Sequence, residues 1–258
     1  MTLPVQPKPS NQWSAKLAIV AGGTNICGLS IGVLSLESHF PKPPGHIKNP
    51  SSLPFTTTYE ILEGLTVPLL LNSPSPEMIE PLIAAAVRLE KAGVKAITGS
   101  CGFLALFQNE IAEAVDVPVF VSSLLQADLI HRMTGKPVGV LTASADLLSP
   151  QHLAAVGADR VPLFIEGMNN GPEFTEVILR NDRNDMDLAK IEAELLEAGE
   201  RLVAKAPDIG AILLECTDLP PYAHSLQSRL GKPVFDIITL AAMLDSAVLR
   251  KPFSGFIH

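Results

Sequence analysis

The sequence predicts an α/β protein of two pseudo-symmetric domains, each a parallel sheet flanked by helices, with the active site in the interdomain cleft. Three observations lead to this fold class. Short apolar runs alternate with helical patterns, which is typical of βαβ units. The chain resembles itself at a fixed offset. Its 258 residues are 47% hydrophobic, which is enough for two cores.

The internal repeat aligns without a gap at an offset of 115 positions. It places Cys101 on Cys216, Ile97 on Ile212, Leu104 on Leu219 and residues 118–120 on residues 233–235. A second similarity lies upstream, where residues 31–35 (IGVLS) resemble residues 138–142 (VGVLT). We therefore expect each half to begin with a buried strand and to follow the same order of elements.

Apolar runs without alternation predict strands that are buried on both faces of a parallel sheet. These runs are residues 31–36, 67–71, 96–98, 117–121, 138–142, 161–165, 211–214 and 234–237. Helical patterns cover residues 76–92, 104–115, 123–133, 149–156, 187–206, 220–230 and 238–249. The proline-rich stretch 39–58 suits neither element. We expect a long loop there, either a lid over the cleft or a plain surface loop.

This order of elements predicts three parts of the chain. Residues 1–28 form an N-terminal arm and loop, residues 29–124 with 237–258 form the first α/β domain, and residues 125–236 form the second. The uncharged stretch 17–36 contains several glycines and runs into the first predicted strand. We therefore interpret it as loop and strand, and not as a membrane or signal segment.

Composition limits the partners. The chain has 27 acidic and 19 basic residues, a net charge of −8, and no basic stripe, so we expect no nucleic-acid partner. Three cysteines are too few for a disulfide framework and suit the reducing cytoplasm. No nucleotide-binding glycine motif follows a strand and the histidines lack metal-ligand spacing, so we expect neither a cofactor nor a metal.

Cys101 and Cys216 follow predicted strands at equivalent positions and precede predicted helices. A helix N-terminus stabilises a thiolate, and a pseudo-twofold axis would place the two sulfurs opposite each other. Asp218 could cap the helix that begins near Pro220. Cys27 has no repeat partner and is interpreted as a core or loop residue. The alternative for the repeated pair is that duplication copied an inert buried cysteine.

Two facing thiols suit proton transfer at a carbon next to a carboxylate. One thiolate removes the proton from one face, and the other thiol returns a proton to the opposite face. The substrate carboxylate takes up charge in the transition state and needs hydrogen-bond donors around it. Candidate substrate-binding residues near the same strand ends are Ser35, Gly102, Ser122, Ser123, Thr142, Ser144 and Thr217.

The cysteine repeat, residues 213–218 (LLECTD) and residues 31–34 (IGVL) resemble the aspartate/glutamate racemase superfamily over most of the chain. The resemblance implies that Cys101 and Cys216 are the two acid–base residues, that Thr217 contacts the substrate, and that the protein is cofactor-independent and a homodimer. Residues 99–103 (GSCGF) depart from the Cys-Asn-Thr sequence common in the amino-acid racemases. With this motif and the long loop, the chain is similar to the dimethylsulfoniopropionate lyases of the same superfamily.

Three functions follow as hypotheses. The first is a racemase or isomerase that acts on a small carboxylate with both cysteines as acid and base. The second is a dimethylsulfoniopropionate lyase that releases dimethyl sulfide and acrylate, in which Phe103, Phe107 or Tyr59 could contact the sulfonium cation. The third is a non-catalytic carboxylate-binding protein.

Overall fold

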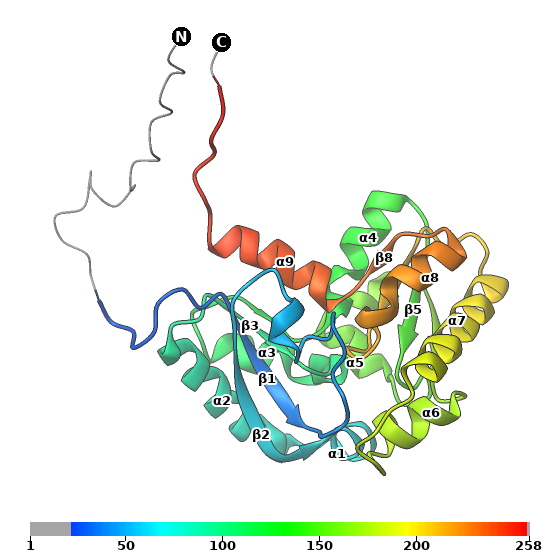
Figure 1. The fold of residues 1–258 in the computed structure, drawn as a ribbon, viewed down its shortest axis with the longest axis horizontal. Coiled ribbons are helices and arrows are strands. Elements are labelled where there is room, and N and C mark those ends of the chain that lie inside the picture. The colour runs from blue at the N-terminus through cyan, green and yellow to red at the C-terminus, as the bar shows by residue number, and fades with distance from the viewer. Residues whose placement is uncertain (1–21, 257–258) are drawn as a thin grey trace, which may run out of the picture.

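The computed structural model describes residues 22–256 and contains two parallel four-stranded sheets that lie next to each other (Figure 1). The strand orders are β2-β1-β3-β4 and β6-β5-β7-β8. The first sheet consists of β1 (Ile31–Glu37), β2 (Thr57–Thr66), β3 (Ala96–Gly99) and β4 (Val119–Phe120). The second consists of β5 (Val138–Thr142), β6 (Leu163–Gly167), β7 (Ala211–Leu214) and β8 (Val234–Phe235). The predicted fold class is confirmed.

Helices connect the strands and cover the sheets. The α-helices are α1 (Val67–Asn72), α2 (Ile79–Ala92), α3 (Gln108–Glu113), α4 (Ala127–Thr134), α5 (Pro150–Ala155), α6 (Pro172–Phe174), α7 (Leu188–Lys205), α8 (Ala223–Leu230) and α9 (Ile237–Val248). Three 3₁₀ turns bear on the site, namely Gly102–Phe107, Ser123–Gln126 and Pro220–Tyr222. Helix α9 follows the last strand of the second sheet but packs on β3 of the first.

The two sheets share the same pairing at their centres. In the first sheet Gly32 of β1 pairs with Ile97 of β3, and in the second Gly139 of β5 pairs with Ile212 of β7. The central strand of each half therefore carries a glycine in the same register. The repeat read from the sequence is thus present in the architecture.

Each of these glycines lets a helix approach its sheet closely. A Cβ atom on Gly32 would lie 3.1 Å from the δ carbons of Leu89 in α2. On Gly139 it would lie 2.6 Å from Cδ1 of Ile209 and 2.9 Å from Cδ2 of Leu202 in α7. A larger residue would push either helix away from its central strand, so the glycines set the helix–sheet spacing of both domains.

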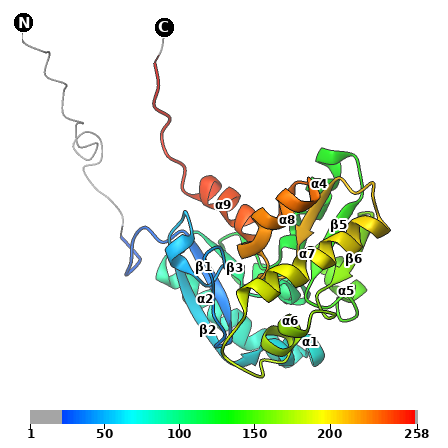
Figure 2. The same ribbon diagram turned by 45° about the vertical axis from the view of Figure 1, so that its right-hand side comes forward.

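Two apolar clusters hold the molecule together. The larger cluster is continuous across both domains and includes Leu34 and Phe103 from the first and Leu202 and Cys216 from the second. The smaller cluster lies on the other face of the first sheet, where α9 and the loop after β1 cover Ile31 and its neighbours. Figure 2 shows α9 crossing beside the first sheet before the chain leads away from the body of the molecule.

One predicted strand is wrong. Residues 67–71 form helix α1, and the strand that pairs with β1 is β2, immediately before it. The side-chain oxygen of Thr66 accepts a hydrogen bond from the amide of Leu69 (3.4 Å), and Pro68 stands in the first helical turn. A hydroxyl cap and an early proline are typical of a helix start, and the apolar run obscured both signals.

Other boundaries also differ from the prediction, and the strand expected over 117–121 is only Val119–Phe120. The strand expected over 234–237 ends at Phe235 because Asp236 caps α9, accepting a hydrogen bond from the amide of Thr239 (2.7 Å). The strand expected over 161–165 lies two residues later, at Leu163–Gly167. The helical segment from Pro172 to Leu179 was not predicted.

Most of the predicted N-terminal arm, residues 1–21, lies outside the described residues. The limits predicted for the two domains stay a prediction. Within residues 22–256, none of the helices combines the length and the apolar character that crossing a bilayer would need. The described part of the apolar stretch 17–36 ends in β1, which is buried in the first domain.

We expect large core truncations in either domain to destabilise the whole molecule, because one cluster spans both. Leu82 of α2 and Leu202 of α7 are both fully buried. Leu82→Ala and Leu202→Ala should each lower the free energy of unfolding by about 2–5 kcal/mol. Urea unfolding followed by circular dichroism measures this, with the exposed Leu188→Ala as control. A loss below about 1 kcal/mol for both core variants would contradict the shared core.

Candidate active site

Cys101 and Cys216 begin equivalent turns at the carboxyl ends of β3 and β7. In each turn the residue before the cysteine donates its amide to the neighbouring strand, and the cysteine carbonyl accepts from the amide three residues later. These hydrogen bonds are Ser100 N to Leu34 O (3.0 Å) and Glu215 N to Leu141 O (2.8 Å), then Leu104 N to Cys101 O (3.1 Å) and Leu219 N to Cys216 O (3.3 Å). The repeat therefore extends to the backbone that carries each thiol.

The two cysteine turns cross each other in direct contact. The Thr217 hydroxyl donates to the carbonyl of Ser100. On the other side of the crossing, Gly102 lies against Glu215, and a Cβ atom on Gly102 would fall 2.1 Å from Oε1 and 2.4 Å from the backbone oxygen of Glu215. Residues 100–102 thus run antiparallel to residues 215–217. The two cysteines stand opposite each other at the centre of this crossing.

Both thiols are buried, and burial favours their protonated form. Cys101 is 9% exposed and Cys216 5% exposed. Burial is the main cause that raises the pKa of each thiol above its ordinary value. The negative charge of Glu215 adds to the increase for both, and the Cys101 thiolate charge adds to it for Cys216, since the two groups are close. The backbone amides that follow each cysteine lower its pKa, as expected for the start of a helical turn, but burial outweighs them.

The surroundings of the two thiols differ. The thiol of Cys216 donates to Oδ2 of Asp218 (3.6 Å), whose charge further raises the pKa of Cys216. Cys101 has no carboxylate at the equivalent position, where the repeat places Phe103. The amide two residues on lowers the pKa of each thiol, that of Phe103 for Cys101 and that of Asp218 for Cys216, and the charge of Asp218 raises both. The positive charge of Lys48 also lowers the pKa of Cys101, against the stronger effect of burial. Of the two, Cys101 has the surroundings that better support a thiolate.

Asp218 does not cap the following helix, contrary to the prediction. Leu219 occupies the cap position of Pro220–Tyr222, and the Asp218 carboxylate points to His46. Burial alone would raise the pKa of Asp218, but the hydrogen bond from His46 and the charges of Lys42 and Lys48 hold it below its ordinary value. Asp218 is therefore a buried negative charge beside the thiols.

His46 is held by hydrogen bonds on both ring nitrogens. Its Nδ1 accepts a hydrogen bond from the backbone amide of Lys48 (2.8 Å), and its Nε2 donates to Oδ1 of Asp218 (2.8 Å). The side chain is 2% exposed. His46 thus links the loop after β1 to the second cysteine turn.

Glu215 is a second buried carboxyl at the crossing. Its side chain is fully buried, Oε2 accepts from the Thr142 hydroxyl (2.7 Å), and Oε1 has no partner among the described residues. Burial raises the pKa of Glu215 to about 7, although the bond from Thr142 and the amide of Ala143 oppose this shift. Near neutral pH the carboxyl therefore changes its charge next to Cys101.

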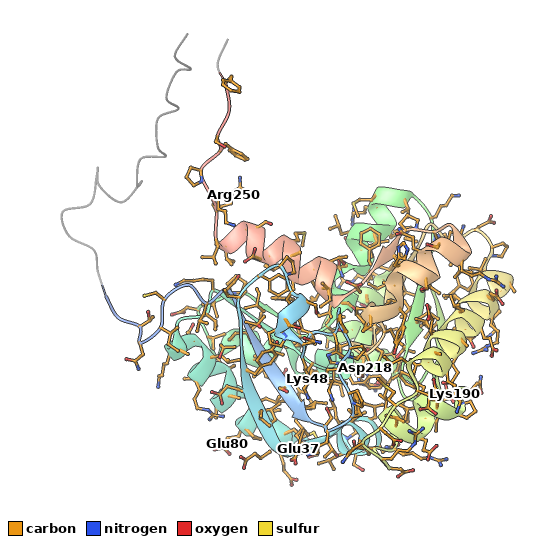
Figure 3. The ribbon with its side chains drawn as sticks, in the orientation of Figure 1. Glu37, Lys48, Glu80, Lys190, Asp218 and Arg250 are labelled. Atoms are coloured by element: carbon orange, nitrogen blue, oxygen red, sulfur yellow. The ribbon has the colours of Figure 1, made fainter. Side chains whose placement is uncertain are left out.

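The loop between β1 and β2, residues 38–56, lies over the cysteine turns and is called the cover loop below. Its Gly45 adopts φ +94°, and a Cβ atom there would lie 3.1 Å from Cα of Pro221 in the second domain. Lys48 and Asp218 lie near each other where this loop meets the second domain (Figure 3). The stretch 39–58 predicted as a loop thus contains the cover loop except for Ser38, and its last two residues begin β2.

Most of the predicted substrate-binding hydroxyls hold the turns in place. Thr142 and Thr217 make the bonds described above. Ser123 donates to the carbonyl of Leu214 across the domains (2.7 Å). Ser122 accepts from the amide of Leu124 (3.3 Å) and begins the turn Ser123–Gln126. These hydroxyls fix the position of the thiols, and their contact with a substrate stays a prediction.

The remaining predicted residues differ in how many contacts they already make with the protein. Gly102 is needed for the close approach to Glu215. The Ser35 hydroxyl bonds weakly to the carbonyl of Leu36 (3.5 Å). Ser144 is 4% exposed, and its hydroxyl forms no hydrogen bond with a described residue. Of the predicted hydroxyls, that of Ser144 is thus the most available to a ligand.

The aromatic residues considered for cation binding are used in packing. Phe103 is 1% exposed and meets the ring of His152 edge-on at 4.8 Å, while Phe107 is buried. The hydroxyl of Tyr59 donates to the carbonyl of Ile47 in the cover loop (2.9 Å). Cys27, outside the site, is exposed.

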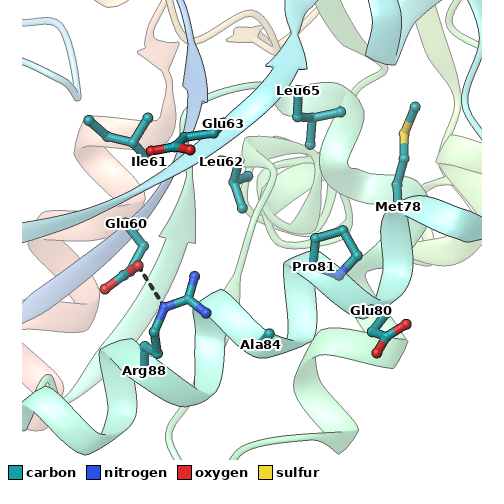
Figure 4. Close-up of a pocket in the computed structure, with 10 residues that line it drawn as sticks. All are labelled: Glu60, Ile61, Leu62, Glu63, Leu65, Met78, Glu80, Pro81, Ala84 and Arg88. Atoms are coloured by element: carbon teal, nitrogen blue, oxygen red, sulfur yellow. Dashed lines mark hydrogen bonds and ion pairs between the residues drawn. The ribbon is translucent and has the colours of Figure 1, made fainter.

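A hollow on the first domain lies away from the cysteines, between β2 and α2 (Figure 4). Its lining includes Leu65 and Met78 and the ion pair of Glu60 with Arg88 (2.9 Å). It holds neither cysteine turn nor cover-loop residue. Within residues 22–256, no three His, Cys, Asp or Glu side chains gather in a way that could hold a metal ion.

Four residues near the thiols were not among the predicted site residues, namely Lys42, His46, Lys48 and Glu215. The sequence carries a signal for each. Three of them are basic residues in a proline-rich loop at the carboxyl end of the first strand, where ligands bind in α/β folds. Glu215 is an acid directly after an apolar buried strand.

The fold occurs in solved structures of low sequence similarity. Glutamate racemase from Bacillus anthracis aligns with a TM-score of 0.57 and 19% identity, covering 86% of this chain and 82% of that one. Picrophilus torridus aspartate racemase gives 0.57 and 14%, covering 87% and 96%. Arylmalonate decarboxylase gives 0.55 and 19%, covering 86% and 92%. These similarities show the fold.

Curated relatives are more similar in sequence. Dimethylsulfoniopropionate lyase 3 of Emiliania huxleyi is 32% identical over 238 residues, which is 88% of this chain. This chain spans 61% of the length of that relative. A dimethylsulfoniopropionate lyase of Durusdinium sp. clade D is 30% identical over 240 residues, covering 90% of this chain and 79% of the relative.

The family model described as Asp/Glu/Hydantoin racemase matches residues 53–244, which include both cysteine turns and the second sheet. The match covers well over half of the chain, and its limits enclose the whole internal repeat around the two thiols. The chain therefore belongs to the Asp/Glu/hydantoin racemase family.

Proposed function

We propose that this protein is a cofactor-independent lyase that removes a proton from the carbon next to the carboxylate of a small acid, with Cys101 as base and Cys216 as the opposing thiol. The observation that supports the proposal is the crossing of the two cysteine turns, which brings Cys101 and Cys216 next to each other. A substrate carbon held between them would meet a base on one face and a proton donor on the other.

The unequal surroundings of the thiols favour elimination over racemisation. A racemase needs two groups of similar basicity, because each must act as base in one direction. Here the thiol of Cys216 donates a hydrogen bond to the Asp218 carboxylate, whereas the charge of Lys48 lowers the pKa of Cys101. An elimination needs only one base.

The proposed substrate class follows from the relatives, which are named dimethylsulfoniopropionate lyases. In this reaction the thiolate of Cys101 takes the Cα proton, and the electron pair of that C–H bond forms the Cα=Cβ double bond. The Cβ–S bond breaks, its electrons neutralise the sulfonium, and dimethyl sulfide leaves together with acrylate. The thiol of Cys216 and the hydroxyl of Ser144 are candidate donors to the carboxylate as it takes up charge.

Racemisation of a small carboxylate is the second candidate, because the backbone of the two cysteine turns is equivalent. We also keep the sequence-based proposals of a homodimer in the cytoplasm and of Ser35, Gly102, Ser122, Ser123, Thr142 and Thr217 as residues that shape the substrate site.

Removal of either thiol should abolish turnover without unfolding the protein. We expect Cys101→Ala to lower acrylate release from dimethylsulfoniopropionate by about 10²–10⁴-fold, the usual contribution of a positioned base. Cys216→Ala should also lose activity, through the missing hydrogen-bond donor to the substrate carboxylate. Acrylate is quantified by liquid chromatography and dimethyl sulfide by gas chromatography. Cys27→Ala is the matched control and should retain the parental rate. Parental rates in both site variants would refute the proposal.

Solvent deuterium distinguishes the candidate functions. The parent in D₂O is incubated with dimethylsulfoniopropionate and with a panel of small carboxylic and amino acids. A lyase releases both products, whereas a racemase incorporates deuterium at Cα of a chiral acid, seen by mass spectrometry, and releases neither. Neither signal on any acid, with ligand affinity unchanged in the Cys101→Ala and Cys216→Ala variants, would favour the non-catalytic binding protein.

Glu215→Gln should shift the pH dependence of the reaction to lower pH. The reaction needs the Cys101 thiolate, so its rate should rise with pH. The Glu215 carboxyl, whose pKa is about 7, is ionised at alkaline pH, and its charge opposes formation of the thiolate. The neutral amide removes that opposition, so the ascending limb of the pH–rate profile moves down. Glu166→Gln, at a partly exposed ion pair of the second domain, is the control. An unmoved limb, or one moved up, would contradict the coupling.

A further inference from the structure

We infer that Lys48, assisted by Lys42, binds the carboxylate of the substrate, so that the cover loop makes the site selective for small anionic acids over neutral compounds of the same shape. The inference rests on the proposed function for the identity of the substrate. The position of the two ammonium groups beside the thiols is a property of the fold. No predicted site residue carries a positive charge, so these lysines would supply the missing one.

Lys48 points inward and keeps a free donor. Its Nζ donates to the carbonyl of Leu36 (2.7 Å) and to the hydroxyl of Ser38 (2.9 Å), which leaves the third N–H of the ammonium group for another acceptor. Its charge acts on the pKa of both Asp218 and Cys101, so the ammonium lies near both groups. Figure 3 shows Lys48 and Asp218 where the two domains meet.

Lys42 adds a second charge to the same place. Its Nζ donates to the carbonyl of Phe40 and lies 3.7 Å from the centre of the Phe40 ring. The pKa of Lys42 is lowered to about 8, first by burial and then by the charge of Lys48, so most of it is protonated at neutral pH. The two ammonium groups therefore lie close enough to repel each other.

The charges around the thiols do not balance. Neither Lys42 nor Lys48 forms an ion pair within 4.0 Å with any carboxylate of residues 22–256. Both ammonium groups lower the pKa of Asp218, and Oδ1 of Asp218 already accepts a hydrogen bond from His46. Two partly buried positive charges thus lie near one ionised carboxylate, Asp218, and near Glu215, whose pKa of about 7 leaves it only partly ionised at neutral pH. A bound carboxylate would neutralise the excess, which is costly to leave buried.

The cover loop holds these groups firmly enough to act in recognition. Tyr59 donates to the carbonyl of Ile47, a fully buried residue between the two lysines. The amide side chain of Asn49 donates to the carbonyl of Lys42 (2.8 Å). With the bond from His46 to Asp218, the loop is attached to both domains, so its ammonium groups are pre-positioned.

Alkylation of the cysteines tests the inference without any turnover. Iodoacetate and iodoacetamide have nearly the same shape, and with either one the thiolate sulfur forms an S–C bond while the C–I bond breaks and iodide leaves. Only iodoacetate carries a carboxylate. The rate of each reagent at each cysteine is measured by mass spectrometry on the intact full chain, with the exposed Cys27 as the internal reference.

We expect the iodoacetate-to-iodoacetamide ratio at Cys101 to exceed that at Cys27. Lys48→Met should lower the ratio at Cys101 by about tenfold, the usual scale for losing a hydrogen bond between charged groups. Lys42→Met should lower it less, Lys48→Arg should retain it, and the exposed Lys95→Met should leave it unchanged. A loosened cover loop would speed both reagents equally, which leaves the ratio unaffected.

A parental ratio equal to that at Cys27, or a ratio unchanged in Lys48→Met, overturns the inference. If both buried thiols resist alkylation, thermal unfolding with propionate or propionamide decides instead. A stabilisation specific to propionate that Lys48→Met removes supports the inference, and its absence overturns it. A charge-dependent ratio without turnover of any acid would retain the anion site and reject the lyase. Turnover of dimethylsulfoniopropionate with a KM that Lys48→Met leaves unchanged would support the lyase and reject the anion site.

Discussion

The contact between the two cysteine turns is the constraint on which the rest of the site depends. Only a residue without a Cβ atom fits at Gly102, because the backbone and carboxyl of Glu215 occupy that space. The Thr217 hydroxyl closes the crossing from the other side. The two sheets must therefore sit at one fixed spacing, and the core that runs continuously through both domains maintains it. The fold thus fixes the relative positions of the two cysteines.

Enclosing the thiols has an electrostatic consequence. Water that would solvate a thiolate is excluded, so burial raises the pKa of both thiols and raises that of the nearby Glu215 carboxyl to about 7. The charge of Asp218 raises the pKa of both thiols further, and the Cys216 thiol donates to it directly. The ammonium of Lys48 opposes these effects at Cys101. Opposite chemical roles can therefore arise from equivalent backbone positions.

The sequence predicts those parts of the molecule that local patterns and the repeat determine. Both cysteines, both central strands and most helices follow from apolar runs and an offset between similar segments. The error at residues 67–71 arose because Thr66 and Pro68, which start a helix, flank a run that reads equally well as a strand. The link from His46 to Asp218 could not be predicted, because it joins residues 172 positions apart through tertiary packing. The role of Ser123 in joining the domains was hidden for the same reason.

The elements that distinguish this site lie where the repeat is broken. After β1 the chain forms the cover loop, whereas after β5 it forms a short connection and α5, so one half carries basic residues that the other lacks. Similarly, Asp218 stands where the first half has Phe103. Duplication supplies two facing thiols, which suit any reaction at a carbon next to a carboxylate. The cover loop and Asp218, which have no counterpart in the other half, make the charges around the two sulfurs unequal. Unequal thiols suit an elimination, which needs one base, better than a racemisation, which needs two.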